Sequence, residues 1–154
     1  MVANDTVKVL HVLSACLFLG NVVVSGTWAF LAERTRTFAV SSFSNRLVLI
    51  TDLIFTLTGA LLVVYTGSLM AHRYDGAPAA SQTWITWSYM LLGLSGLIWL
   101  LVLVPIQLRQ RMLLKRDQAV TTEYLKLSRI WQISGAIATV VPLPIVYLMI
   151  IKGI

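Results

Sequence analysis

Four long apolar stretches dominate this sequence and restrict what it can fold into. They cover approximately residues 7–31, 47–71, 84–106 and 130–151. Each is long enough to cross the bilayer core as a helix of about 20 residues. One such stretch is compatible with a buried helix of a soluble protein, but four in 154 residues are not. The sequence therefore predicts an all-α, four-helix transmembrane bundle that forms a single integral membrane domain.

The composition supports this fold class. Hydrophobic residues make up 58% of the chain and charged residues only 12%, whereas soluble domains carry about 25% charged residues. The remaining polar segments are too short to hold a soluble catalytic domain of ordinary size. The first apolar stretch has no basic leader and no convincing small-residue cleavage site, so we expect it to be retained as a membrane helix.

The basic residues are distributed unevenly along the chain, whose net charge is +6. Of the 12 basic residues, only Lys8, Arg73 and Lys152 flank the side that holds both termini. By the positive-inside rule the first and third connections are cytoplasmic, which places both termini outside a bacterial inner membrane. We expect the bilayer and its anionic headgroups, rather than nucleic acid, as partners of the basic side. The other nine basic residues lie in the first and third connections: Arg34, Arg36, Arg46, Arg109, Arg111, Lys115, Arg116, Lys126 and Arg129.

The connections and the small residues lead to further expectations. Residues 71–83 are typical of a flexible outer loop, while 107–129 favour helical extensions at the headgroups. Pro142 and Pro144 predict a bend in the last helix. Small residues predict close helix approach in the third and fourth helices, which makes these faces candidate interfaces of a homodimer. They are Gly93, Gly96, Ser134, Gly135 and Ala138.

One face of the first helix is polar and must turn inward, because polar groups are unfavourable against hydrocarbon. Ser14, Asn21 and Ser25 are interpreted as hydrogen-bonding groups between helices. His11 lies closer to the outer surface, where an imidazole can ligate a metal, relay a proton or form an ordinary hydrogen bond. Spacing by three and four residues defines the face: His11, Ser14, Phe18, Asn21, Ser25 and Trp28.

Asp52 is the only acidic residue inside a predicted span. It shares a helix face with Thr56. An ionised carboxylate in mid-membrane costs about 3 kcal/mol on insertion scales. Asp52 is therefore expected to lie near the inner headgroups, to pair with Arg109 or Arg129, or to be protonated. The corresponding functional hypothesis is a proton relay through Asp52, Asn21 and Thr56.

The outer ends of the first two helices suggest a haem site. Antiparallel packing places His11 level with Met70, His72 and Arg73. Histidine and methionine side chains serve as axial ligands of haem, and Arg73 would pair with a propionate. His72 lies about 200° from Asp52 around an ideal helix. His11 is therefore the first candidate ligand, and Met70 and His72 compete for the second position.

The chain resembles the family of predicted bacterial integral membrane proteins catalogued as DUF2269. The similarity is carried by VKVLHVLSACLFLG from Val7, TDLIFTLTGALLVVYTG from Thr51, WLLVLVPIQLRQRM from Trp99, YLKLSRIWQISG from Tyr124, and YLMIIKG near the end. The resemblance implies a four-helix membrane protein. The family's motif positions fall here on His11, Asp52, Thr56, Gly67, Pro105, Gln107 and Trp131.

The opening KVLHVL is also similar to the first helix of two other small membrane families. These are the four-helix protoporphyrinogen oxidase, which binds haem, and the copper-resistance membrane domain. Both resemblances imply that a histidine here serves a porphyrin or a metal. The sequence GTWAFLAERTRT lacks the arginine and second histidine of the oxidase pattern at the end of helix one. Porphyrinogen oxidation is therefore only an analogy.

Three functional hypotheses follow. The leading one is a haem b-binding membrane protein, an electron-transfer component or a haem-dependent oxidoreductase. The second is a conduit for a small ion or metabolite along the intramembrane polar path. The third is a structural subunit of a larger membrane complex. The sequence contains no CxxC, HExxH or P-loop motif that would indicate hydrolytic or nucleotide-driven chemistry.

Overall fold

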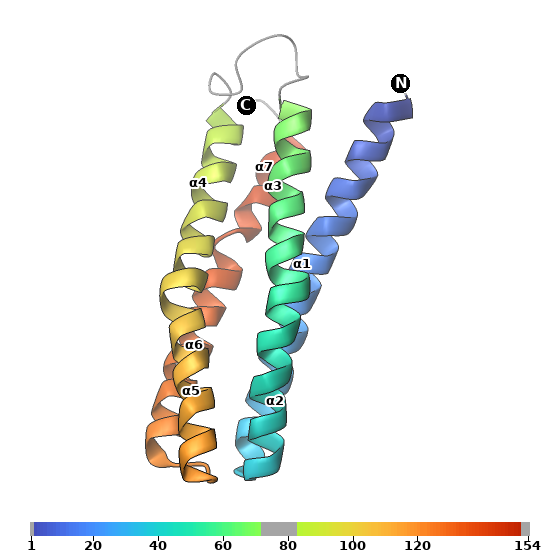
Figure 1. Ribbon diagram of the computed structural model, residues 1–154. Coiled ribbons are helices and arrows are strands. Elements are labelled where there is room, and N and C mark those ends of the chain that lie inside the picture. The colour runs from blue at the N-terminus through green and yellow to red at the C-terminus, as the bar shows by residue number, and fades with distance from the viewer. Residues whose placement is uncertain (1, 72–82, 152–154) are drawn as a thin grey trace.

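The computed structural model describes residues 2–71 and 83–151, and these residues form helices with no strand (Figure 1). The elements are α1 (Val2–Thr35), α2 (Phe38–Thr51), η1 (Asp52–Leu57), α3 (Thr58–Ala71), α4 (Thr83–Ile98), η3 (Trp99–Leu103), α5 (Val104–Asp117), α6 (Thr122–Val140) and α7 (Leu143–Ile151). These elements form four helical rods, namely α1, α2–η1–α3, α4–η3–α5 and α6–α7, and each rod is long and apolar enough to cross a membrane. The predicted all-α, four-helix architecture is confirmed.

The rods run up and down, so that the first and third connections lie at one end of the bundle and the ends of α3, α4 and α7 lie at the other (Figure 1). We call the end with the two basic connections the basic end. The rods extend beyond the apolar cores, because the helices continue through charged residues to Thr35 and Asp117. The helical extensions expected within 107–129 are therefore present. Residues 72–82, which include the expected loop, lie outside the described part of the chain.

Turns at the basic end are tight and use left-handed residues. Arg36 follows α1 with φ 50°, and Gln118 follows α5 with φ 48°. The amide of Arg36 donates to the carbonyl of Glu33 at 3.1 Å. Glycine is the usual residue at this position of a helix end, because it has no Cβ to clash. Here the sequence places an arginine and a glutamine instead.

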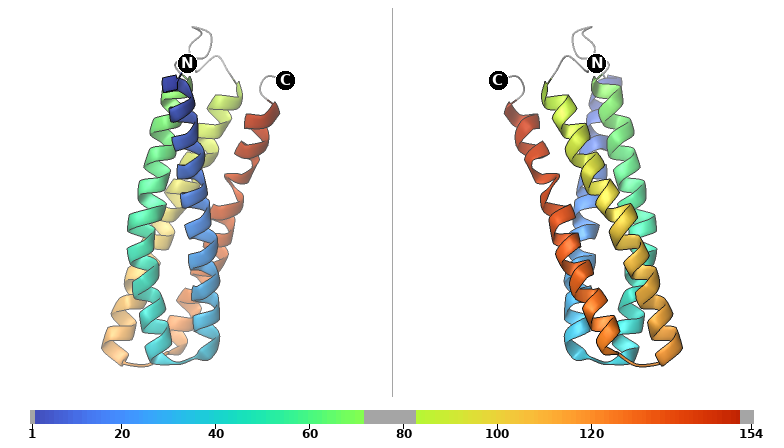
Figure 2. Two further views of the ribbon diagram at one scale, coloured as in Figure 1. Left: turned by 90° about the vertical axis from the view of Figure 1, so that its right-hand side faces the viewer. Right: turned by 90° about the vertical axis from the view of Figure 1, so that its left-hand side faces the viewer.

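Pi-helical segments and prolines interrupt three of the rods. η3 ends two residues before Pro105, which has no N–H for the helical ladder and crowds the preceding turn. The last rod breaks between Val140 and Leu143, so α7 leaves the direction of α6 (Figure 2). The bend predicted from Pro142 and Pro144 is confirmed. η1 contains no proline or glycine, and no feature of the sequence predicts it.

Most large apolar side chains face outward, as expected for a surface that contacts lipid. Phe43, Leu101 and Ile150 are 68%, 66% and 77% exposed. The buried apolar core is small and lies toward the basic end, in two clusters. One contains Val48, Leu103, Trp131 and Ala138, and the other Leu113, Leu114 and Tyr124.

Close helix approach occurs at other glycines than those predicted. A Cβ added to Gly59 would lie 3.1 Å from the Cβ of Phe18, so α3 and α1 are nearly in backbone contact there. A Cβ at Gly93 or Gly96 would meet nothing within 4 Å, so these two positions face open space. Close approach of another helix at these two residues therefore stays a prediction. α4 is instead joined to α6 by Ser95, which donates to the carbonyl of Ala138 at 2.6 Å.

Candidate functional site

Asp52 is the centre of a hydrogen-bonded cluster that joins three rods. It begins η1 and is 6% exposed. Its Oδ2 accepts a hydrogen bond from Nε2 of Gln107 in α5 at 2.9 Å. Its Oδ1 accepts from the hydroxyl of Thr56 at 3.1 Å and from Nδ2 of Asn21 in α1 at 3.2 Å. Both carboxylate oxygens are therefore held by neutral donors from the bundle interior.

Asn21 and Thr56 also bind each other, which closes the cluster. Nδ2 of Asn21 donates to the hydroxyl oxygen of Thr56 at 2.8 Å, and that hydroxyl donates to Asp52. The sequence grouped these three residues as a polar path, and the structure brings them into direct contact. Ser14 and Ser25 behave differently, because their hydroxyls donate to carbonyls of their own helix. The interpretation of these two serines as links between helices is wrong.

The expected arginine partner of Asp52 is not present. Arg109 instead forms an exposed ion pair with Glu123 at 2.8 Å. Arg129 lies at the basic end, next to α1. Among the residues that the structure describes, no cation lies within salt-bridge distance of Asp52. Asp52 lies 14 residues after Phe38, the first residue of α2, which corresponds to about 20 Å along the helix axis.

A second polar group lies between Asp52 and the basic end. It surrounds a small cavity of about 20 Å³ lined by Ser44, Asn45, Gln107, Tyr124, Trp131 and neighbouring residues. The Oγ of Ser44, Oδ1 of Asn45 and Nε1 of Trp131 are buried without a hydrogen-bond partner. Unpaired buried polar atoms are unfavourable, and a polar cavity of this size accommodates one water molecule. We call this cavity the polar chamber.

Glu33 continues the polar interior toward the basic end. Its Oε2 accepts a hydrogen bond from Ser128, a residue that also lines the polar chamber, at 2.6 Å. Nε2 of Gln132 donates to the same oxygen. Glu33 lies in α1 and its two partners lie in α6. A chain of polar residues therefore extends from Asp52 through Gln107 and the polar chamber to Glu33.

Sequence reasoning missed most of the inner part of this chain. Glu33, Gln110 and Ser128 were not predicted, and Gln107 entered only through the family resemblance. The signal was present in the third rod, where four buried residues recur at helical spacing: Leu103 at the end of η3, and Gln107, Gln110 and Leu114 in α5. Because residues 107–129 carry many charges, they were interpreted as helical extensions at the headgroups. The inward polar face of Gln107 and Gln110 was therefore overlooked.

His11 forms a separate contact toward the opposite end. Its ring is 7% exposed, and Nδ1 lies 2.9 Å from the hydroxyl of Thr66. That hydroxyl donates to the carbonyl of Leu62. In the tautomer that fits this donation, the hydroxyl oxygen accepts from the ring, so the proton of the neutral imidazole lies on Nδ1 and a lone pair on Nε2. The geometry leaves Nε2 as the nitrogen available to a ligand.

Of the two predicted second haem ligands, Met70 lies within the described residues and His72 does not. His11 contacts Thr66 and stands against Gly67, where an added Cβ would lie 3.3 Å from Cε1 of the ring. Met70 is partly buried and lies one turn beyond Thr66. His72 and Arg73 are outside the described residues. The described residues also contain no group of three or more His, Cys, Asp or Glu arranged to hold a metal ion.

The family comparison covers almost the whole chain. The family DUF2269, described as a predicted integral membrane protein, matches residues 5–153. The chain belongs to this family. Searches of the curated proteins and of the solved structures found no match.

The family assignment agrees with a multi-pass protein in a lipid bilayer. The motif positions singled out by the resemblance also fall into contact in this DUF2269 chain. Asp52, Thr56 and Gln107 belong to one hydrogen-bonded cluster. His11 and Gly67 adjoin each other between α1 and α3. Asp52 and its partners are the best-defined candidate site.

Proposed function

We propose that this protein carries protons within the membrane, with Asp52 as the group that binds and releases each proton. The observation that carries the proposal is a buried carboxylate held only by neutral donors. Protonation of such a group leaves no unpaired cation behind. If an arginine were its partner, protonation would strand a buried positive charge, which is strongly unfavourable.

Membrane burial and hydrogen bonding act in opposite directions on the charge state of Asp52. Placing an ionised carboxylate at the centre of a membrane helix costs about 3 kcal/mol on insertion scales. Each hydrogen bond to a charged group returns about 1.5–3 kcal/mol. The three donors on Asn21, Thr56 and Gln107 therefore offset the cost of an ionised Asp52 inside the bundle. Because all three donors are neutral, protonation of the carboxylate leaves no buried charge unpaired, which suits a relay.

The polar interior at the basic end supports a route to that side. Gln107 contacts Asp52 through its side chain, and its carbonyl accepts from Nδ2 of Asn45 at 3.4 Å. Asn45 and Gln107 line the polar chamber, where a water molecule would connect their groups to Ser128 and Glu33. Protons are expected to pass between Asp52 and the basic end through this water rather than through the amide groups.

A flux measurement tests the relay. The protein is reconstituted in liposomes that contain a pH-sensitive dye, and a potassium diffusion potential drives protons inward. Wild-type protein is expected to acidify the lumen faster than protein-free liposomes, and Asp52→Asn is expected to remove the difference. Asp117→Asn is the matched control, because Asp117 is a surface carboxylate paired with Arg116. Wild-type liposomes without flux, or undiminished flux in Asp52→Asn, would refute the proposal.

Haem b binding for electron transfer is a second candidate, with His11 as an axial ligand. The specific support is the lone pair assigned to Nε2 by the Thr66 contact, since metal-ligating histidines characteristically hydrogen-bond through their other nitrogen. Expression with added haem should give a Soret band that is lost in His11→Ala and kept in Asp52→Asn. Unchanged haem content in His11→Ala, or a wild-type protein without the band, would exclude this role.

We also propose an orientation in a bacterial inner membrane, with the basic end in the cytoplasm and in contact with anionic headgroups. The support is the concentration of arginine and lysine at that end. Cysteines are introduced at Thr83 and Gln118, at opposite ends, in a Cys16→Ser background. An impermeant maleimide applied to spheroplasts is expected to label only the Thr83 position. Labelling of only the Gln118 position would reverse the orientation.

A homodimer through the third and fourth rods remains a proposal. Its support is the open space at Gly93 and Gly96, which meet no other part of the described chain. Small residues on an open helix face permit close approach of a second membrane helix. The mass of the particle in nanodiscs distinguishes a monomer from a homodimer. A monomeric mass would exclude the dimer.

A further inference from the structure

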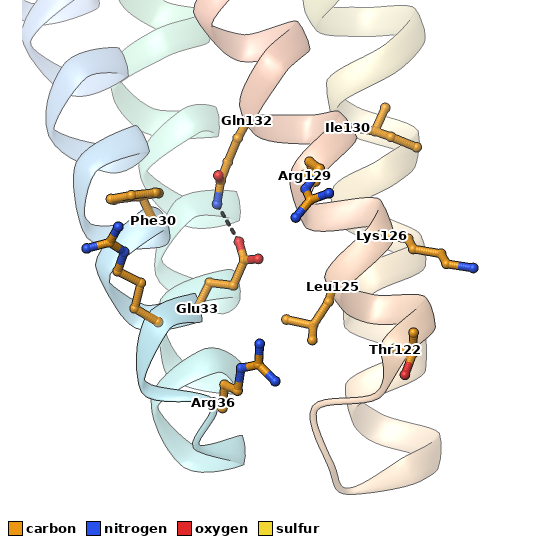
Figure 3. A pocket seen from close by; sticks show the side chains of 10 residues that line it. Phe30, Glu33, Arg36, Thr122, Leu125, Lys126, Arg129, Ile130 and Gln132 are labelled. Atoms are coloured by element: carbon orange, nitrogen blue, oxygen red, sulfur yellow. Dashed lines mark hydrogen bonds between the residues drawn. The ribbon is translucent and has the colours of Figure 1, made fainter.

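A large cavity lies at the basic end, between the final turns of α1 and the first turns of α6. It has a volume of about 780 Å³. Figure 3 shows Glu33 and Arg36 reaching into it from the α1 side, opposite Arg129 on α6. Arg34 and Lys126 also line it. We call this cavity the basic pocket; it shares no lining residue with the polar chamber, but Glu33 connects the two through its hydrogen bond with Ser128.

The charges of the basic pocket are not balanced by the protein. Four cationic side chains line it, and Glu33 is its only acidic residue. The Glu33 carboxylate is already engaged by Ser128 and Gln132, which are neutral. The ion pairs found in the described chain, Arg109–Glu123 and Arg116–Asp117, lie elsewhere. Cations gathered around one cavity repel each other, and a bound anion would relieve that repulsion.

Arg36 and Arg129 are the two groups best placed for such an anion. Their guanidinium groups point toward the space beside Glu33, whereas Lys126 extends away from it (Figure 3). Arg34 instead forms a cation–π contact, since its guanidinium lies 4.6 Å from the ring centre of Phe30. Guanidinium groups match the paired oxygens of a phosphate through parallel hydrogen bonds. The shape of the donor set therefore favours a phosphate group.

The backbone at Arg36 adds an independent argument. This residue holds φ 50°, a left-handed conformation that is unfavourable for a residue with a Cβ. A glycine at this helix end would avoid the cost. The chain nevertheless has an arginine there, and its side chain enters the basic pocket. Strained residues of this kind concentrate at binding sites, where the side chain compensates for the backbone.

The walls of the pocket identify the source of the phosphate. Phe30, Leu125 and Ile130 line it beside the cations, so the cavity is both apolar and basic. It lies at a bundle end where helices expected to cross the bilayer reach the headgroup region. We propose that the basic pocket binds the phosphate of an anionic phospholipid through Arg36 and Arg129, with its chains along the apolar wall. This deepens the proposed headgroup contact and rests on that contact, but not on proton transfer.

Lipid titration of the full-length protein tests the site. Delipidated protein in detergent is titrated with phosphatidylglycerol, and bound lipids are counted by native mass spectrometry. Arg36→Gln with Arg129→Gln is expected to weaken the first binding event at least about tenfold, since a hydrogen bond to a charged group is worth about 1.5–3 kcal/mol. Arg111→Gln with Lys115→Gln removes the same charge outside the pocket and is the matched control.

Further measurements distinguish a specific lipid site from general charge attraction, from binding of free phosphate and from misfolding. Equal losses in the two double variants would mean general attraction of charge and would overturn the site. Displacement of the lipid by millimolar inorganic phosphate would overturn the lipid as the source of the phosphate. Arg36→Gly should lose the lipid while melting no lower than wild type, which excludes misfolding as the cause. Gln118→Gly is its control, because it relaxes an equivalent backbone position outside the pocket.

Discussion

The half of the bundle nearer the basic end differs from the opposite half in how its rods meet. Near the basic end α1, α2, α5 and α6 pack around shared buried residues such as Val48 and Trp131. In the opposite half α1 packs along α3, and α4 packs against α7 (Figure 1). The exposed hydrogen bond between Ser68 and Tyr89 connects these two pairs at 2.8 Å.

This difference in packing determines where the chain can bury polar groups. The half nearer the basic end holds the polar chamber and Glu33, and it meets Asp52 and Gln107 at mid-bundle. Such polar groups need neighbours on several sides to satisfy them, since lipid offers no hydrogen bonds. The opposite half offers fewer neighbours, and there His11 relies on Thr66 alone for a side-chain partner. The buried polar side chains are therefore concentrated in the half of the bundle where all four rods pack together.

Truncation of one apolar side chain in each half should show the largest contrast. Leu114→Ala, in the well-packed half, is expected to lower the unfolding free energy by about 4 kcal/mol, because its cavity cannot collapse. Ile145→Ala, in α7, is expected to cost about 2 kcal/mol, since fewer elements surround it. Reversible unfolding in mixed detergent micelles measures both. Equal costs would contradict the described difference in packing.

Glycine substitutions test which contact holds the opposite half together. Gly59→Ala places a Cβ against the backbone of Phe18 and is expected to cost about 2 kcal/mol as α1 and α3 are pushed apart. Gly20→Ala is the control, because nothing lies within 4 Å of its added methyl group. It should gain about 0.5–1 kcal/mol from helix propensity. A neutral Gly59→Ala would show that the α1–α3 contact is not critical.

The amino-acid sequence predicts the rods but not their interior pairing. Apolar runs long enough to cross a bilayer leave few alternatives, so the four helices and the break at Pro142 follow from composition and spacing. Helical spacing also predicts that Asp52 and Asn21 face inward. It cannot rank the possible partners of Asp52, because an arginine and a glutamine at similar depth satisfy the same pattern. The choice of Gln107 depends on the relative rotation of α5.

The basic pocket illustrates the same limit. The charges of Arg36 and Arg129 are evident in the sequence and correctly indicate a basic end. Their convergence is not, because the two residues are separated by most of the chain and meet only when α1 and α6 pack together. The left-handed backbone of Arg36 is equally invisible, since arginine carries no preference for it.

Removal of the hydroxyl that holds His11 should have a moderate effect. Thr66→Val leaves Nδ1 of His11 buried without its partner, and we expect a cost of about 1–2 kcal/mol. Thr27→Val is the control, because its exposed hydroxyl bonds only to the carbonyl of Val23 in its own helix. The same unfolding assay measures both variants. If both change stability equally, His11 does not depend on Thr66, and the assignment of its tautomer fails with it.

Relief of backbone strain at the basic end should give the smallest effect, and it has the opposite sign. Arg36→Gly removes a Cβ conflict worth about 1–2 kcal/mol but increases the freedom of the unfolded chain by about 0.5–1 kcal/mol. A net gain of about 0.5–1 kcal/mol is expected in lipid-free detergent, and Gln118→Gly should gain a similar amount. Added phosphatidylglycerol should stabilise the wild type and Gln118→Gly but not Arg36→Gly. A loss of stability in Arg36→Gly without lipid would mean that the arginine supports the fold itself, and the strain at this position would then need no ligand to explain it.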